Sequence, residues 1–234
     1  MNASVISSRR EPAVSSPAMI AEARDRAALI ALLADLFRRE PDQQMLASLR
    51  KAELREALSQ AGMALEDSFF NDDIDALAEM LAVEYARLFL LPGTMISPHE
   101  SVQIKRGSGL LRGPETARVR EYYEYVGFEM EEILPMEADH ISIELEFLSH
   151  LATEEANAWE SGEHKKALDA LRYQDDFLRR HLGQWGFDFL DRVEAAAGSG
   201  FYYELARLTA AFLKEQREQL PQMIAQLQSE QTGS

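Results

Sequence analysis

The stretch that decides the fold is Glu137-Ala-Asp-His-Ile-Ser-Ile-Glu-Leu-Glu-Phe-Leu148, in which an acidic cluster runs straight into an apolar pattern. Ile141, Leu145 and Leu148 recur at spacings of four and three residues. That periodicity places them on one face of an α-helix. The segment therefore predicts a helix that is buried along this face.

The acidic residues at the start of this segment have two interpretations. Pro135 suits the first turn of a helix, and Glu137 and Asp139 would then lie in that turn, where the helix dipole favours negative charge. In one interpretation both carboxylates only cap the helix, and His140 is a structural histidine. In the other they form a binding site. A histidine beside two carboxylates should hold its proton more tightly, which predicts that His140 titrates near physiological pH.

The rest of the chain also follows helical periodicity. Expected helices cover residues 18–39, a segment from Pro41 to about residue 60, and residues 74–89, 114–126, 162–182, 187–197 and 201–220, in addition to the helix after Pro135. No alternating strand pattern occurs. The sequence predicts an all-α fold, with a single globular domain of about eight or nine helices over residues 18–230.

Two kinds of segment interrupt the helical pattern. Residues 1–17 are rich in Ser and Pro and are expected to be a disordered tail. Ser8-Arg-Arg10 resembles the start of a twin-arginine export signal, but no apolar run follows it, so we expect a cytoplasmic protein. Residues 92–114 form a long stretch rich in Pro and Gly, which is typical of a functional loop. This segment and residues 127–136 could act as hinges for domain swapping.

Composition narrows the classes of partner. The chain has no cysteine, so disulfides and thiolate ligands are excluded. With 24 Lys and Arg against 40 Asp and Glu, the formal net charge is −16, which disfavours nucleic acid as partner and leaves a basic peptide partner open. For the acidity alone, a soluble protein whose copies repel one another is the simpler interpretation. No apolar run of 18 residues exists, so stable membrane insertion is not expected.

Three motifs in a fixed order resemble the TorD/DmsD-type chaperones, which mature molybdenum-cofactor oxidoreductases in the cytoplasm. They are Tyr85-Ala-Arg-Leu-Phe89 with Pro92, then Pro98-His-Glu-Ser101, and then the 137–148 segment; the later runs Phe177-Leu-x-x-His-Leu182 and Phe201-Tyr-x-x-Leu-Ala206 extend the resemblance over residues 75–215. The resemblance implies a chaperone, not an enzyme. Its implied partners are the apo-form of a molybdoenzyme catalytic subunit and that subunit's twin-arginine signal peptide.

The resemblance also implies a leader-binding surface. Its candidate residues are Tyr85, Leu88, Phe89, Pro92, Pro98, Glu100, Ser101, Glu137, Asp139 and His140. The apolar members would form a groove for the leader's apolar region, and the carboxylates would meet its arginines. Simpler interpretations remain open: Leu88 could be core packing, and Glu100 and Ser101 could begin a short helix. Some family members carry tryptophans in the proline loop, where this chain has aliphatic residues.

Other functional classes have weaker support in the sequence. Glu137 and His140 form the only Glu-x-x-His pair, whereas a carboxylate-bridged di-iron bundle needs two, and no phosphate-binding loop motif occurs. We therefore expect neither a metal nor another cofactor. A helical metal- or nucleotide-dependent enzyme and an acidic helical adaptor are the alternatives to a chaperone. The sequence leaves a monomer and a homodimer equally open.

Overall fold

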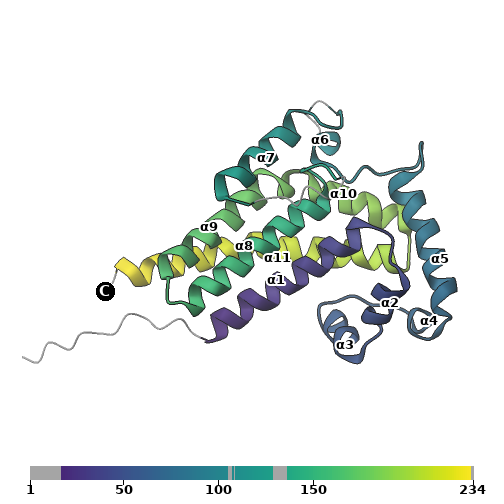
Figure 1. The fold of residues 1–234 in the computed structure, drawn as a ribbon, viewed down its shortest axis with the longest axis horizontal. Coiled ribbons are helices and arrows are strands. Elements are labelled where there is room, and N and C mark those ends of the chain that lie inside the picture. The colour runs from purple at the N-terminus through teal and green to yellow at the C-terminus, as the bar shows by residue number, and fades with distance from the viewer. Residues whose placement is uncertain (1–16, 105–106, 108, 129–135, 233–234) are drawn as a thin grey trace, which may run out of the picture.

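The computed structural model describes residues 17–104, 107, 109–128 and 136–232 of the 234-residue chain. The helices are α1 (Pro17–Arg38), α2 (Gln43–Leu49), α3 (Ala52–Gln60), α4 (Asp67–Asn71), α5 (Ile74–Tyr85), the π-helix η1 (Ala86–Leu90), α6 (Glu100–Gln103), α7 (Pro114–Val126), α8 (Ile141–Glu160), α9 (His164–Arg180), α10 (Leu182–Ala197) and α11 (Phe201–Thr232) (Figure 1). The described part of the chain contains no strand, which confirms the predicted all-α fold.

The long helices α1, α8, α9 and α11 run along the length of the molecule (Figure 1). α1 packs on α8, α8 on α9, and α9 on α11. The predicted face of α8, with Ile141, Leu145 and Leu148, is buried, and so are Ile143 and Phe147 on its other sides. A helix that is buried on several sides, as the first turns of α8 are, belongs in a core. α8 is therefore the central helix of the fold.

The shorter helices cover one end and one side of this bundle. α5 and η1 lie at the end farthest from the C-terminus, with α2, α3 and α4 beside them, and α6 and α7 lie on top of the bundle (Figure 1). η1 contacts α10, and α6 contacts both α7 and α10. The loop after η1 therefore runs from the end of the molecule to its top.

A buried ion pair fixes α1 against α8. Arg26 donates to Glu155, and both side chains are less than a tenth exposed. The Glu155 carboxylate also accepts hydrogen bonds from Gln174 Nε2 at 2.8 Å and from the indole of Trp159 at 3.3 Å. A buried charge is tolerated only when it is paired and hydrogen-bonded in this way.

The helix count is higher than predicted, for local reasons. The segment expected to run from Pro41 to residue 60 is two helices, because Lys51 adopts an extended conformation between them. α4 and α6 have only five and four residues, too few for periodicity to reveal them. The predicted break near residue 182 lies at His181, whose backbone leaves the helical region. Gly183 is required just after it, because a Cβ there would lie 2.2 Å from the carbonyl oxygen of Leu178.

Other helix ends also differ from the prediction. α10 begins at Leu182, where a start near residue 187 was expected. α8 begins at Ile141, so Glu137 and Asp139 precede the helix and do not lie in its first turn. α11 was expected to end at Leu220 but continues through Pro221 to Thr232. Its length shows that one proline, which removes a single backbone donor, does not end a helix of this size.

Several sequence predictions fall outside the described residues. Residues 1–16, which hold the predicted tail and Ser8-Arg-Arg10, are among them, as are parts of both predicted hinges. Pro17 itself begins α1. The tail, the hinges and domain swapping stay predictions. Among the described residues, no helix combines the length and the apolar character needed to cross a bilayer.

The buried ion pair yields a stability prediction. Replacing Glu155 by Ala should lower the free energy of unfolding by about 3–5 kcal/mol, because Arg26 would be left buried and unpaired. Glu160→Ala is the control, since its ion pair with Arg24 is exposed and should contribute only about 0–1 kcal/mol. Urea denaturation followed by circular dichroism measures both. Equal losses in the two variants would contradict a structural role for the buried pair.

Candidate functional site

The proline loop and the acidic segment, far apart in the sequence, are joined by their backbones. The amide of Ile141 donates to the carbonyl of Pro98, and the amide of Glu100 donates to the carbonyl of Asp139, both at 2.9 Å. These bonds form an isolated antiparallel bridge between His99 and His140. Two of the predicted motifs are therefore one structural unit.

Asp139 stabilises this junction. Its side chain is fully buried, and Oδ2 accepts a hydrogen bond at 2.9 Å from the amide of Ser101, in the first turn of α6. The other carboxylate oxygen, Oδ1, and the buried hydroxyl of Ser101 have no hydrogen-bond partner among the described residues. In this structure Asp139 caps α6 across the junction and presents no carboxylate to the surface.

His140 caps the start of α8. Its Nδ1 accepts a hydrogen bond from the amide of Ser142 at 3.1 Å, and its ring packs edge-on against that of His99, with ring centres 5.0 Å apart. Burial, with His99 and Arg38 as nearby cationic groups, lowers the pKa of His140 to about 3. The predicted titration near physiological pH is wrong, because burial disfavours the charged imidazolium form of His140 and lowers its pKa. His140 is neutral and structural.

A second buried group lies beneath the junction. Glu100 is almost fully buried, and its Oε2 lies 3.2 Å from Nδ1 of His181. Glu144, one turn into α8, accepts the indole N–H of Trp185 at 3.2 Å. Burial, and then the proximity of Glu100, raise the pKa of Glu144 well above its ordinary value. A neutral Glu144 can donate a hydrogen bond to Glu100, so this acidic interior carries fewer charges than the sequence suggests.

Sequence reasoning did not identify the partners in this group. Neither Trp185 nor His181 is among the candidate site residues predicted from the sequence, because only the fold brings α10 beside α6. The one available signal was the spacing of Glu144, four residues after His140, which places it on the same helix.

Glu137 is the accessible carboxylate of the predicted set. Its Oε1 accepts a hydrogen bond at 2.6 Å from Nε of Arg112, and 17% of its side chain remains exposed. Arg112 is 76% exposed and adopts a positive φ of 62°, which is uncommon for a residue with a side chain. Glu137 therefore already holds a guanidinium group at the surface.

The predicted aromatic helix does not form a surface groove. Tyr85, Leu88 and Phe89 are all buried. The Tyr85 hydroxyl donates to the carbonyl of Arg38 at 3.2 Å, and burial raises the pKa of Tyr85 to about 12. Phe89 packs in an aromatic cluster with Tyr85, Phe37, Phe189 and Tyr202. In this structure these three predicted residues build the core and cannot touch a peptide directly; Pro98 and Ser101 are buried as well.

Apolar side chains that do reach solvent follow this buried segment. Leu90, Leu91 and Met95 are 57%, 51% and 47% exposed, and Pro92 between them is exposed too. η1 directs them outward: its wide turn closes with the amide of Leu91 donating to the carbonyl of Ala86. π-turns of this kind are frequent at functional sites. We call Leu90, Leu91, Pro92 and Met95 the apolar strip.

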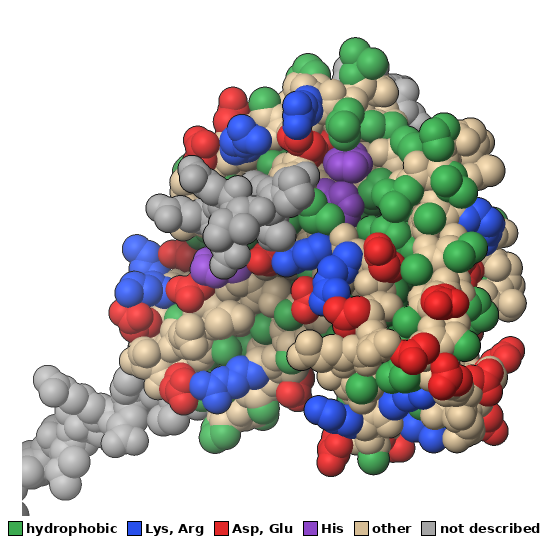
Figure 2. Space-filling view, turned by 45° about the vertical axis from the view of Figure 1, so that its right-hand side comes forward, with side chains coloured by type: hydrophobic (Ala, Val, Ile, Leu, Met, Phe, Trp, Pro, Cys, Tyr) green, Lys and Arg blue, Asp and Glu red, His purple; other side chains and the backbone are tan. Residues whose placement is uncertain are grey.

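Apolar side chains also gather on the face of the molecule near α5. Figure 2 turns the α5 side of the molecule forward and shows hydrophobic side chains gathered in the upper right of that face. Within the described residues, Met80 and Val83 on α5 are also more than half exposed.

No group of histidines and carboxylates in the described part of the chain is arranged to hold a metal ion.

The buried histidine predicts a pH dependence. Unfolded His140 gains a proton below its ordinary pKa of 6.5, whereas the folded residue stays neutral down to about pH 3, so its contribution to stability is present above about pH 6.5 and is lost as pH falls. His140→Asn keeps a capping oxygen but cannot titrate. Between about pH 6.5 and pH 5, wild type should lose stability faster than this variant, by at most about 1.4 kcal/mol per pH unit. The raised pKa of Glu144 changes stability with pH in the opposite sense, but Glu144 is present in both proteins. The quantity to compare is therefore the difference in free energy of unfolding between wild type and His140→Asn, measured by urea denaturation at each pH. Parallel pH profiles would contradict it.

Comparison with known proteins identifies the family. The family model described as "Nitrate reductase delta subunit" matches residues 53–191. "Chaperone protein TorD" of Vibrio cholerae serotype O1 (strain M66-2) is 33% identical over 214 residues, which is 85% of this chain and 93% of that protein. "Chaperone protein TorD" of Shewanella sp. (strain ANA-3) is 30% identical, over 84% of this chain and 94% of the relative. The crystal structure of a redox enzyme maturation protein from Archaeoglobus fulgidus aligns with a TM-score of 0.44 and 24% identity, over 84% of this chain and 93% of that one. The chain belongs to the family of the nitrate reductase delta subunit and the TorD chaperones.

Proposed function

We propose that this chaperone acts in the cytoplasm on a molybdenum-cofactor oxidoreductase. It binds the enzyme's twin-arginine leader and its apo-form, and it prevents export until the cofactor has been inserted. Family membership supports the chaperone class, and the motif resemblance supports this class of client. The single observation that carries the proposal is the exposed apolar strip, Leu90 to Met95, beside the junction of the proline loop and the acidic segment.

The apolar strip suits the apolar region of a leader peptide. Clustered large apolar side chains at a protein surface mark interaction sites, because leaving them in water is unfavourable. Leu91 and Met95 are flexible and can adapt to several apolar sequences. In this proposal the strip contacts the leader directly, in place of Tyr85, Leu88 and Phe89, which the sequence had suggested for that role. Those three residues instead pack in the core and support η1.

Glu137 suits one arginine of the leader. It already binds the guanidinium of Arg112, and both side chains reach solvent. A leader arginine can replace Arg112 on the same carboxylate through a charge-assisted hydrogen bond. Glu100, Asp139 and His140 then act as positioning residues, because each is buried and occupied at the junction. Once the client has folded around its cofactor it no longer exposes these segments, and release follows.

The strip gives the first binding prediction. A synthetic twin-arginine leader peptide should bind with micromolar affinity, about −8 kcal/mol. Replacing Leu91 and Met95 by Ser should weaken binding at least about tenfold without lowering stability, since both side chains are about half exposed. Tyr125→Ser on α7 is the control, because it removes an exposed apolar side chain away from the strip. Titration calorimetry measures the affinity of wild type, of the double variant and of the control. Equal affinities would rule out the strip as the binding site of the leader.

Substituting the two members of the Arg112–Glu137 pair should change the affinity for the leader in opposite directions. Arg112→Ala should strengthen leader binding by up to about fivefold, because an internal competitor worth up to about 1 kcal/mol is removed. Glu137→Gln should weaken binding and reduce its dependence on salt. Arg217→Ala on α11, an exposed arginine that does not line the hollow around Arg112 and Glu137, controls for the change in net charge. A loss of affinity in Arg112→Ala would show that Arg112 assists the leader and does not compete with it.

A further inference from the structure

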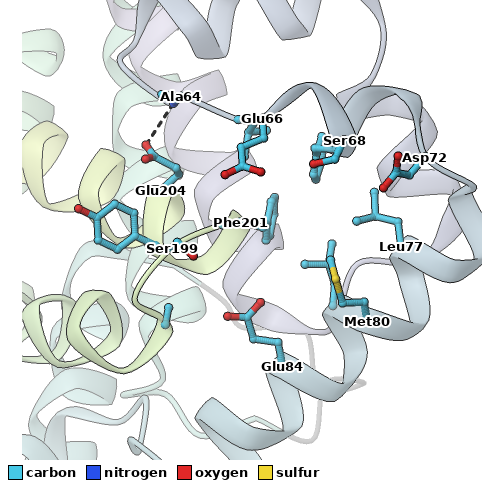
Figure 3. Close-up of a pocket in the computed structure, with 16 residues that line it drawn as sticks. Ala64, Glu66, Ser68, Asp72, Leu77, Met80, Glu84, Ser199, Phe201 and Glu204 are labelled. Atoms are coloured by element: carbon cyan, nitrogen blue, oxygen red, sulfur yellow. Dashed lines mark hydrogen bonds between the residues drawn. The ribbon is translucent and has the colours of Figure 1, made fainter.

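A hollow on α4, α5 and the start of α11 has no part in the site described above. It is lined by an apolar floor and an acidic rim, with no Lys or Arg among its lining residues (Figure 3). The floor includes Phe69 and Phe201, whose rings stack with centres 5.6 Å apart. Met80 on α5 also lines the hollow and is 57% exposed. Its apolar surface is therefore open to solvent on one side.

The rim carries four carboxylates, of which two lie near an arginine and two do not. Glu204 is buried, accepts the amide of Ala64 at 3.1 Å, and lies 3.3 Å from Arg207. Glu84 has Arg87 at 3.7 Å. Glu66 and Asp72 are exposed and have no ion pair among the described residues. The rim thus has more negative charge than its neighbouring arginines neutralise.

The arrangement of these groups indicates what could fill the hollow. Figure 3 shows Glu66 and Glu84 on opposite sides of Phe201, with both carboxylates directed toward the space between them, and Met80 reaching into the same space. Burial raises the pKa of Glu84, so a cation that approaches it would relieve a desolvated charge. An apolar centre between two carboxylates complements an apolar side chain between two cationic ones.

We propose that this acidic hollow is a second peptide-binding site, which takes a segment of a partner polypeptide carrying a large apolar side chain flanked by two arginines or lysines. The apolar side chain would rest on Phe201 and Met80, and the cations would pair with Glu66 and Glu84. This inference rests on the proposed function in one respect: the segment would come from the body of the client enzyme. The apolar strip remains the separate place for the leader.

A short fluorescent peptide, Arg-Leu-Leu-Arg flanked by Gly and Ser, tests the chemistry directly on the full chain. Fluorescence anisotropy should show saturable binding that weakens with added salt. Affinity should fall at least about tenfold in the double variant Glu66→Gln and Glu84→Gln, and also in Met80→Ser. The matched control is Glu22→Gln with Glu79→Gln, two exposed carboxylates outside the hollow, which changes the net charge equally and should leave affinity unchanged. Thermal melting checks that every variant folds.

The same variants separate this inference from the proposed function. The leader peptide should bind the Glu66 and Glu84 double variant as it binds wild type, and the Arg-Leu-Leu-Arg peptide should bind the Leu91 and Met95 double variant as it binds wild type. Failure of the Arg-Leu-Leu-Arg peptide to bind wild type, or an equal loss in the control pair, would overturn the second site. Failure of the leader peptide alone would overturn the proposed function and leave the second site standing.

Discussion

Two backbone hydrogen bonds, between Pro98 and Ile141 and between Asp139 and Glu100, determine the arrangement of the functional end of this molecule. They fix the loop that leaves η1 against the start of the central helix α8. The buried Asp139 carboxylate holds α6 in place, and α6 in turn brings Glu100 to His181. The exposed strip, which lies at the end of η1 and the start of this loop, is therefore anchored at one end by the aromatic core beneath η1 and at the other by this junction.

The same junction explains why a strongly acidic chain has so few accessible carboxylates where its sequence motifs concentrate them. Glu100, Asp139 and Glu144 lie in the interior, where an imidazole, a backbone amide and an indole, respectively, lie within hydrogen-bond distance of one oxygen or more of each carboxyl group. Glu137, only two residues from Asp139, is at the surface. Neighbouring acidic residues thus have separate roles: the buried ones hold the junction together, and the exposed one pairs with a guanidinium group at the surface.

Much of the fold followed from the sequence, and the failures have physical causes. Periodicity found α8 through Ile141, Leu145 and Leu148. The helix predicted over residues 114–126 is α7, which begins at Pro114. It could not place the start of α8, because acidic residues in a loop before a helix look the same as acidic residues in its first turn. His140, which is not a typical capping residue, marks the true start.

The candidate site was predictable in position but not in accessibility. The motifs grouped the proline loop with the acidic segment, and the structure joins them. Helical spacing, however, shows that Tyr85, Leu88 and Phe89 share a face without showing whether that face meets the core or solvent. The π-turn that directs Leu90 and Leu91 outward has no reliable sequence signal. Nor do the acidic hollow and the Glu144–Trp185 contact, which depend on helices distant in the chain.

The separation of the two bridged histidines has a consequence for how the protein is made. His99 and His140 are 140 − 99 = 41 positions apart, so their bridge closes a loop that includes all of α7. Closing such a loop costs chain entropy before its contacts form, which places it late in folding compared with the local helices. On a ribosome, the segments on either side of this junction emerge well apart in time. A surface that depends on the junction exists only once the chain is complete to at least the start of α8, so under the proposed function a half-made chain cannot capture a client.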